Sequence, residues 1–194
     1  MLSCVPVLRG ALVERRQGVV SEANRVLVFT GDGKGKTTAA LGMVLRAAGH
    51  GIPALVVEFL KADARSGELE AAKRLPGVEI VQMGRGFVPP VDNPRYEEHR
   101  TAAVEALNFA EAALRSGRYG LVVLDEVCGA VNRGLLREDA VCEAVEAAAP
   151  GTCVVLTGRG ATEKLLALAD TVTEMRCVRH GMDAGIGAQK GVEF

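Results

Sequence analysis

Residues 26–38 read VLVFTGDGKGKTT, a run that joins an apolar strand to a helix through a turn with three glycines. Gly31, Gly33 and Gly35 permit backbone conformations that a Cβ would hinder, so several backbone N–H groups can point at one anion. The helix that begins near Lys36 directs the positive end of its dipole to the same place. The segment therefore predicts a loop that holds a chain of phosphates within an α/β fold.

The side chains of this loop have separate expected roles. Lys36 would place its charge beside the terminal phosphates, and the Thr37 hydroxyl would ligate Mg²⁺. The standard pattern G-x-x-x-x-G-K-[ST] has glycine where this chain has Thr30, so the loop is a variant of that pattern. A glycine-rich β-turn without a ligand is the alternative, and the flanking strand and helix argue against it. The expected nucleotide-binding residues are Gly31, Asp32, Gly33, Lys34, Gly35, Lys36, Thr37 and Thr38.

Composition limits the partners of this chain. With 194 residues, of which 48% are hydrophobic but only 4% aromatic, it is expected to fold as one domain with an aliphatic core. A net charge of −1 gives no electrostatic footprint for nucleic acid. No apolar stretch has the length of a membrane span, and the first residues lack the order of a signal peptide. Five scattered cysteines without a C-x-x-C pair predict reduced thiols and a cytoplasmic location.

Predicted strands and helices alternate along the chain, which indicates βαβ units. We expect a single three-layer αβα domain over residues 23–194, with a mostly parallel sheet of the P-loop NTPase-like (RecA-like) kind. Expected strands cover residues 25–30, 54–60, 78–83, 121–124, 153–157 and 172–178. Expected helices cover residues 36–48, 68–74 and 137–148, with one starting at 93–94, one ending at 169, and an irregular tail from 179.

Three further strand ends supply polar side chains where ligands collect in parallel sheets, namely Glu58 to Lys61, Asp125-Glu126 and Thr157 to Arg159. The LVVLDE stretch has the form of a Walker B strand, so Asp125 or Glu126 is expected near Mg²⁺. The alternative is that the aspartate caps a helix. Arg159 lies between two glycines, from which it could approach a triphosphate, or it is simply an arginine of a surface turn.

Seven stretches of the chain resemble the ATP:corrinoid adenosyltransferases of the cob(I)yrinic acid a,c-diamide type. The C-terminal Asp-Ala-Gly run, followed by Ala-Gln-x-Gly, is the most specific because generic phosphate-loop ATPases do not share it. The resemblance extends from about Arg25 to the C-terminus. The stretches are VFTGDGKGKTTAALG (28–42), VEFLK (57–61), GVEIVQMGRGF (77–87), VVLDE (122–126), VVLTGRG (154–160), LADTVTEMR (168–176) and HGMDAGIGAQKGVEF (180–194).

The resemblance implies that a Co(I) corrinoid attacks the 5′ carbon of ATP, forming a cobalt–carbon bond and expelling tripolyphosphate, in cobalamin biosynthesis or salvage. Lys36 and Arg159 would act on the leaving group. Phe87 would fill the lower face of the corrin, which removes the lower axial ligand and eases reduction of the cobalt. Without the resemblance, the alternative is that Phe87 anchors its loop by packing on the core. The family often has tryptophan two residues further on, where this chain has Pro89.

The resemblance also implies the remaining components of the reaction. Thr37 and Glu126 would ligate Mg²⁺ with support from Asp125. ATP and a reduced corrinoid would be the substrates, and a flavoprotein reductase would supply the electrons. The chain would assemble as a homodimer. Residues 1–22 would form a lid. The alternatives are a conventional P-loop kinase or ATPase, a nucleic-acid-dependent ATPase, for which no basic stripe is present, and a non-catalytic corrinoid carrier.

Overall fold

The computed structural model describes residues 24–63 and 65–192, so the predicted lid lies outside the described residues. Six strands form one sheet in the order β3-β2-β4-β5-β1-β6, and every neighbouring pair is parallel. The strands are β1 (Arg25–Thr30), β2 (Ala54–Glu58), β3 (Val78–Gln82), β4 (Leu121–Asp125), β5 (Cys153–Thr157) and β6 (Thr171–Glu174). The helices are α1 (Lys36–Gly49), α2 (Gly67–Ala72), α3 (Tyr96–Arg115), α4 (Val127–Asn132), α5 (Glu138–Glu146), α6 (Glu163–Ala167) and the 3-10 helix η1 (Gly181–Ala184).

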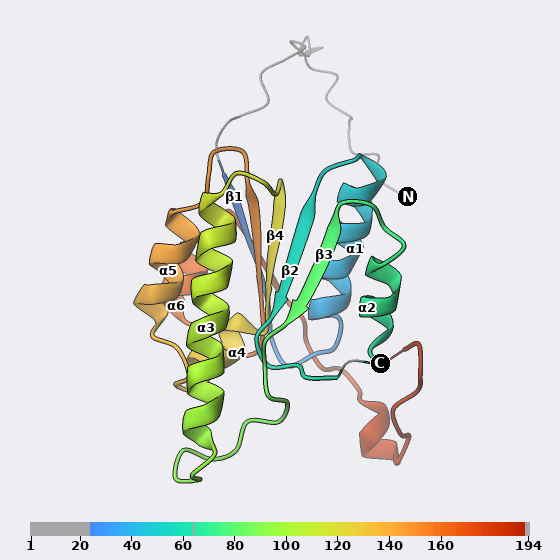
Figure 1. Cartoon of the computed structure of the whole chain (residues 1–194). Coiled ribbons are helices and arrows are strands. Elements are labelled where there is room, and N and C mark those ends of the chain that lie inside the picture. The colour runs from blue at the N-terminus through green and yellow to red at the C-terminus, as the bar shows by residue number, and fades with distance from the viewer. Residues whose placement is uncertain (1–23, 64, 193–194) are drawn as a thin grey trace, which may run out of the picture.

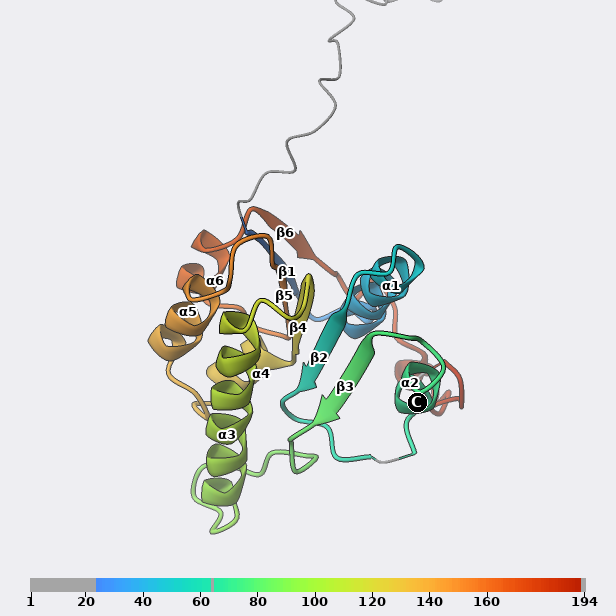
Figure 2. The same cartoon turned by 45° about the horizontal axis from the view of Figure 1, so that its top comes forward.

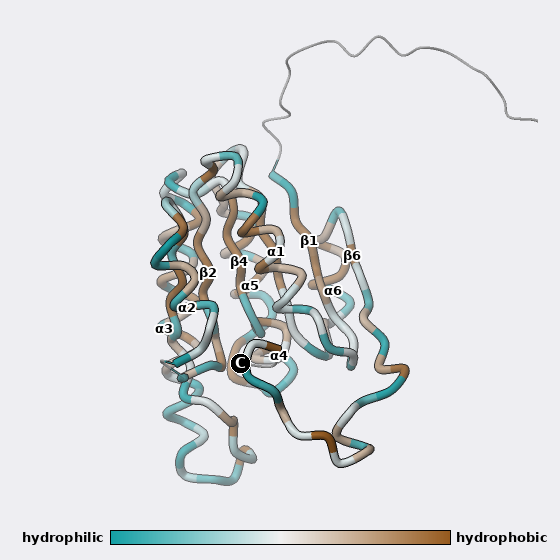
Figure 3. Tube along the Cα trace, turned by 90° about the vertical axis from the view of Figure 1, so that its right-hand side faces the viewer, coloured by the Kyte–Doolittle hydropathy of each residue, from teal (hydrophilic) through white to brown (hydrophobic). Residues whose placement is uncertain are grey.

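Helices cover both faces of the sheet, as the predicted three-layer architecture requires. Helices α1 and α2 lie on one side, whereas α3, α5 and α6 lie on the other (Figures 1 and 2). Each side has its own apolar cluster, and the most hydrophobic parts of the chain are strands between the helical layers (Figure 3). None of the helices in the described part of the chain is long and apolar enough to cross a membrane.

The two central strands β2 and β4 place acidic side chains at the carboxyl edge of the sheet. All five residues of β2 and all five of β4 are buried, because helices cover both faces of a parallel sheet. Each of these strands ends in one acidic residue, Glu58 in β2 and Asp125 in β4, and these two residues are partners in the register. The two carboxylates are therefore placed side by side at the carboxyl edge of the sheet, without solvent exposure.

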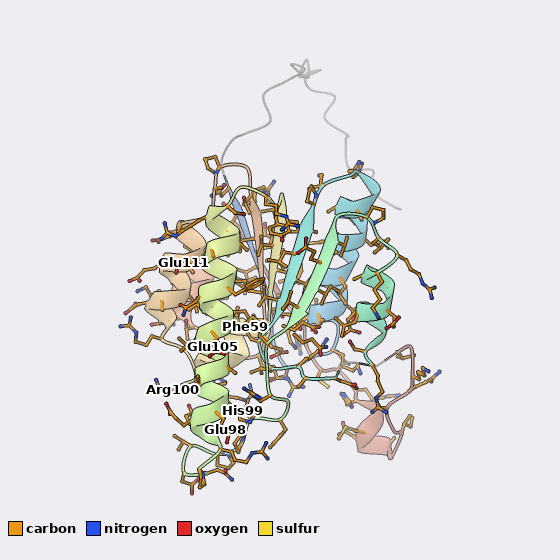
Figure 4. The ribbon with its side chains drawn as sticks, in the orientation of Figure 1. Phe59, Glu98, His99, Arg100, Glu105 and Glu111 are labelled. Carbon is orange, nitrogen blue, oxygen red and sulfur yellow. The ribbon has the colours of Figure 1, made fainter. Side chains whose placement is uncertain are left out.

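Helix α3 confirms the amphipathic pattern seen in the sequence. Its predicted inner face is buried, including Ala103, Leu107, Ala110 and Leu114. Phe59, which follows β2 and is labelled in Figure 4, belongs to the same apolar cluster as these residues. Figure 4 also labels polar residues along α3 from Glu98 to Glu111, which belong to its more exposed positions except for the buried His99.

Several predicted boundaries were wrong by a few residues. The predicted strand 54–60 ends at Glu58, the predicted helix 68–74 covers Gly67–Ala72, and the predicted strand 172–178 covers Thr171–Glu174. Helix α3 begins at Tyr96 rather than at 93–94, because the Asn93 side chain accepts a hydrogen bond from the Arg95 N–H and closes a turn before the helix. Two short elements were missed: α4 directly after β4, and η1 inside the tail expected to be irregular.

Candidate active site

The phosphate loop packs against the chain that leaves β6. The Gly33 N–H donates to the Met175 carbonyl over 2.7 Å, and Gly31 has a positive φ of 93°. A Cβ on Gly31 would lie 2.5 Å from the Met175 oxygen, and one on Gly33 would lie 2.7 Å from the Arg176 backbone. Both glycines are therefore required by a close backbone approach as well as by the loop conformation. Sequence reasoning assigned them to phosphate binding alone.

Lys36 lies inside the loop that it follows. Its Nζ donates to the carbonyls of Gly31 and Gly33, over 2.7 and 2.6 Å, and only 6% of the residue is exposed. Burial lowers the pKa of its ammonium, and the neighbouring Arg159 acts in the same direction, whereas Glu126 opposes the shift. The loop thus holds a partly desolvated cation at the start of α1, where the helix dipole also favours an anion.

Thr37 at the start of α1 contacts Asp125 at the carboxyl end of β4, and both were predicted from the sequence to lie at a magnesium site. The Thr37 hydroxyl donates to Asp125 Oδ1 over 2.8 Å, and the Thr157 hydroxyl donates to the same oxygen over 2.7 Å. Thr157 ends β5, which lies between β1 and β4, so it bridges the gap between the two predicted partners. Sequence reasoning did not choose Thr157, although it noted that strand end. The residue at the N-cap of α4 is Glu126, so the alternative role of Asp125 as a helix cap is wrong.

Glu126 takes a strained backbone conformation at the end of β4. Its φ of 62° makes it the sole non-glycine with a positive φ among the described residues. It precedes α4 without capping that helix through its side chain. Burial raises the pKa of its carboxyl, and the adjacent Asp125 adds to the rise. Strain of this kind persists where the surrounding structure requires it and is concentrated at functional sites.

Sequence reasoning noted the strand end from Glu58 to Lys61 but did not predict the ion cluster that forms there beside Asp125. Lys61 Nζ donates to Glu58 Oε1 over 2.8 Å and to Glu68 Oε1 over 2.6 Å, and it lies 3.9 Å from Asp125 Oδ2. Glu58 is fully buried, which raises the pKa of its carboxyl. Burial alone would lower the pKa of Lys61, but its bonds to Glu58 and Glu68 raise it above the ordinary value. The available signal was Glu58 itself, the one polar residue of an otherwise apolar strand.

Two cavities meet at the carboxyl edge of the sheet. The first, of about 550 Å³, is bordered by the phosphate loop and by aliphatic residues of α1 and α2. The second, of about 720 Å³, is bordered by the loop after β3, including Phe87. Lys61, Glu126 and Arg159 border both cavities. The two spaces are thus separate compartments with a shared charged boundary.

Phe87 does not anchor its loop in the core. It is 92% exposed, the largest exposed fraction among the large hydrophobic side chains that the structure describes. The alternative interpretation of Phe87 as a core anchor is therefore wrong. Pro89 lies close by and borders a third, smaller hollow together with Phe87. Arg159 is exposed as well, but its position at both cavities brings it together with the phosphate loop.

The residues predicted to hold Mg²⁺ have suitable chemistry. Mg²⁺ prefers hard oxygen ligands and is usually held by one or two carboxylates together with substrate phosphates and water. Thr37 and Asp125 offer such oxygens, and Asp125 Oδ2 is buried without a hydrogen-bond partner among the described residues. No cluster of three or more His, Cys, Asp or Glu residues able to hold a metal occurs in ranges 24–63 and 65–192. The set therefore fits an ion completed by a nucleotide.

A glycine loop at the end of β1, a buried lysine at the start of α1 and an acidic end of β4 define a P-loop nucleotide-binding protein. The chain belongs to the ATP:corrinoid adenosyltransferase family. The family model described as "ATP:corrinoid adenosyltransferase BtuR/CobO/CobP" matches residues 22–194.

Individual relatives agree with this assignment. A corrinoid adenosyltransferase from Pseudomonas aeruginosa is 41% identical, and the match covers 94% of this chain and 93% of the relative. The corrinoid adenosyltransferase CobA from Salmonella typhimurium is 40% identical, over 89% of this chain and 87% of the relative. A corrinoid adenosyltransferase from Escherichia coli is 38% identical, with the same coverage of both chains.

Proposed function

We propose that this chain transfers the 5′-deoxyadenosyl group of ATP to the cobalt of a Co(I) corrinoid and releases intact tripolyphosphate. Its family provides the general reaction, ATP-dependent adenosylation of a corrinoid. The observation that favours the detailed form is the pair of cavities that share Lys61, Glu126 and Arg159. A phosphate site that shares a charged boundary with a second compartment suits the transfer of a group from one bound substrate to another.

The phosphate loop would stabilise the leaving group. In the proposed step the cobalt electron pair forms a bond to C5′, the C5′–O5′ bond breaks, and its electrons leave on tripolyphosphate. Lys36 would exchange the carbonyls of Gly31 and Gly33 for phosphate oxygens, and its buried ammonium would then balance their charge. Arg159, at the boundary of the two cavities, is placed to act on the same polyphosphate.

We propose Thr37 and Glu126 as magnesium ligands, with Asp125 in a supporting position. When bound with ATP, the ion would draw negative charge from the departing oxygen. Thr37 and Thr157 hold Asp125 Oδ1 in place, so the position of this carboxylate does not depend on a mobile side chain. The same two bonds orient Oδ2, which is buried without a hydrogen-bond partner among the described residues.

Phe87 would contact the lower face of the corrin ring. Its exposed aromatic side chain borders the second cavity, where it could replace the polar lower axial ligand of the cobalt with an apolar surface. Loss of that ligand makes Co(II) easier to reduce. The role of Phe87 would therefore concern the reduction more than the attack on ATP.

Product analysis tests the proposal. Under anaerobic conditions with Mg²⁺, ATP, a corrinoid and a strong reductant, we expect adenosylated corrinoid and one tripolyphosphate per turnover. Lys36→Ala should remove most of the rate, whereas Lys73→Ala, an exposed change on α2's C-terminal side, should leave it unchanged. Release of orthophosphate without any need for corrinoid would instead show a conventional kinase or ATPase, and corrinoid binding without turnover would show a carrier.

We also propose the cellular setting. The four cysteines in the described residues are free thiols, which supports a reducing compartment such as the cytoplasm. Formation of Co(I) requires an electron donor, and a flavoprotein reductase would supply it. A homodimer is the proposed assembly. Measurement of the mass in solution, and reduction assays with purified flavin reductases, test these two points separately.

A further inference from the structure

We propose that Arg85 and Arg133 make the second cavity select corrinoids with free carboxylates on the ring periphery over fully amidated ones. The inference rests on the proposed function, because it assigns the corrinoid to this cavity. A corrin ring has acetate and propionate side chains, and each exists either as a carboxylate or as a carboxamide. The charge of the cavity wall can therefore distinguish two otherwise similar substrates.

The second cavity has an excess of positive charge. Four cationic residues border it (Lys61, Arg85, Arg133 and Arg159) against two acidic ones (Asp63 and Glu126), a difference of two charges. The whole chain has a net charge of −1, so this excess is local. Lys61 is committed to the carboxylates of Glu58 and Glu68, and Arg159 also borders the phosphate site. The two remaining cations are Arg85 and Arg133.

Arg133 is fixed at the end of α4. The Tyr96 hydroxyl donates to the Arg133 carbonyl over 2.6 Å, and Arg133 Nη1 donates to the Gly129 carbonyl over 3.2 Å. Gly129 leaves room for this side chain, because a Cβ there would lie 3.1 Å from Arg133 Nη1 and 2.6 Å from Glu126 Oε2. Only one of the five guanidinium N–H donors is needed for the Gly129 bond. The guanidinium is thus held at the cavity with donor capacity for a ligand.

The backbone on both sides of Arg85 is held against the chain that follows β2. The Gly86 N–H donates to the Leu60 carbonyl over 2.8 Å, and a Cβ on Gly84 would lie 2.2 Å from the Leu60 backbone. These contacts hold the loop against Leu60, which lies just after β2. Arg85 is therefore fixed through its backbone near Phe87, while its side chain is exposed. A corrin lying on Phe87 would bring its peripheral groups to the two arginines that border the same space.

An arginine distinguishes a carboxylate from a carboxamide by charge and by geometry. A carboxylate accepts two charge-assisted hydrogen bonds from the guanidinium fork, whereas an amide has one acceptor and no charge. Because both arginines are exposed, each contact should be modest, and we expect about a three- to tenfold preference for the acidic corrinoid in kcat/KM. The preference should decrease with rising salt, since exposed charges are screened.

The test compares two corrinoids with the same ring, one with free carboxylates and one fully amidated, both prereduced to Co(I). Wild type, Arg85→Gln, Arg133→Gln and the double variant are assayed with each, and the KM for ATP is measured in parallel. Arg137→Gln is the matched control, because Arg137 is exposed and borders neither the first nor the second cavity. We expect the double variant to lose most of its rate with the acidic corrinoid, so that the ratio of the two kcat/KM values approaches one.

Each other outcome overturns the inference. An active wild type without a preference would refute it and leave the proposed function intact. Equal losses with both corrinoids would show that the arginines do not recognise charge. A higher KM for ATP with an unchanged ratio would assign them to the polyphosphate. A wild type that adenosylates neither corrinoid would instead refute the proposed function.

Discussion

Lys61 should be the residue on which the buried carboxylates at the sheet edge depend for their stability. Lys61→Met keeps the length of the side chain but removes the hydrogen-bonded cation beside Glu58, which is 0% exposed. Removing one partner of a fully buried pair costs roughly 3–5 kcal/mol. The Lys61 side chain is 34% exposed, so solvent screening reduces the effect, and we expect about 2 kcal/mol.

Thermal unfolding measures this cost. For a chain of this size, about 2 kcal/mol corresponds to a decrease in Tm of roughly 4–8 °C near pH 7.5. Lys73→Met is the matched control, because Lys73 pairs with Glu70 while both side chains are more than half exposed, at 68% and 58%. It should lower the free energy of unfolding by less than about 0.5 kcal/mol. The variant Glu58→Gln combined with Lys61→Met should recover part of the loss, because position 58 then has no buried charge that lacks a partner.

The pH dependence identifies the cause. Burial raises the pKa of Glu58 above the ordinary glutamate value, and Lys61 opposes that rise. Lys61→Met should therefore raise the folded-state pKa further. A folded-state pKa of Glu58 above its unfolded-state pKa favours folding at pH values below the unfolded-state pKa. This contribution to stability is lost as pH rises through the folded-state pKa of Glu58. The cost of Lys61→Met should thus be largest near neutral pH and decrease towards pH 4.5. A pH-independent cost, or one equal to that of Lys73→Met, would refute the reasoning.

Three further changes test other parts of the site. Gly33→Ala should destabilise the fold by about 1–3 kcal/mol in thermal unfolding, because the new Cβ would lie 2.7 Å from the Arg176 backbone. Gly42→Ala, on α1 with open space around it, should instead stabilise the fold by about 0.5–1 kcal/mol. Asp125→Asn should raise the Mg²⁺ concentration that gives half-maximal turnover by about 10- to 100-fold. An unchanged magnesium titration would contradict the supporting role of Asp125. Phe87→Ala should lower the rate from Co(II) at least about tenfold more than the rate from prereduced corrinoid, a difference of ~1.4 kcal/mol; equal losses would exclude the proposed effect on reduction.

Much of the nucleotide site follows from local sequence. The glycines, Lys36 and Thr37 lie within one strand–loop–helix unit, so their proximity is fixed by covalent spacing and helix geometry. Asp125 was predictable because acidic residues that end buried parallel strands must meet other strand ends at the same edge. The seven motifs added the family, which the comparisons confirm. Boundaries were less certain, since the end of an element depends on side-chain bonds such as that from the Arg95 N–H to Asn93 Oδ1.

Only the tertiary structure brought distant parts of the chain together. Thr157 joins the site because β5 inserts between β1 and β4, an order that sequence separation does not encode. Gly33 must lack a Cβ because the chain after β6, more than one hundred and forty residues later, packs against it. Arg85 and Arg133 are ordinary surface arginines in the sequence, and they share a cavity with Phe87 only because β3 and α4 end at the same edge of the sheet. Long-range packing decides such proximities, and local propensity contains no information about them.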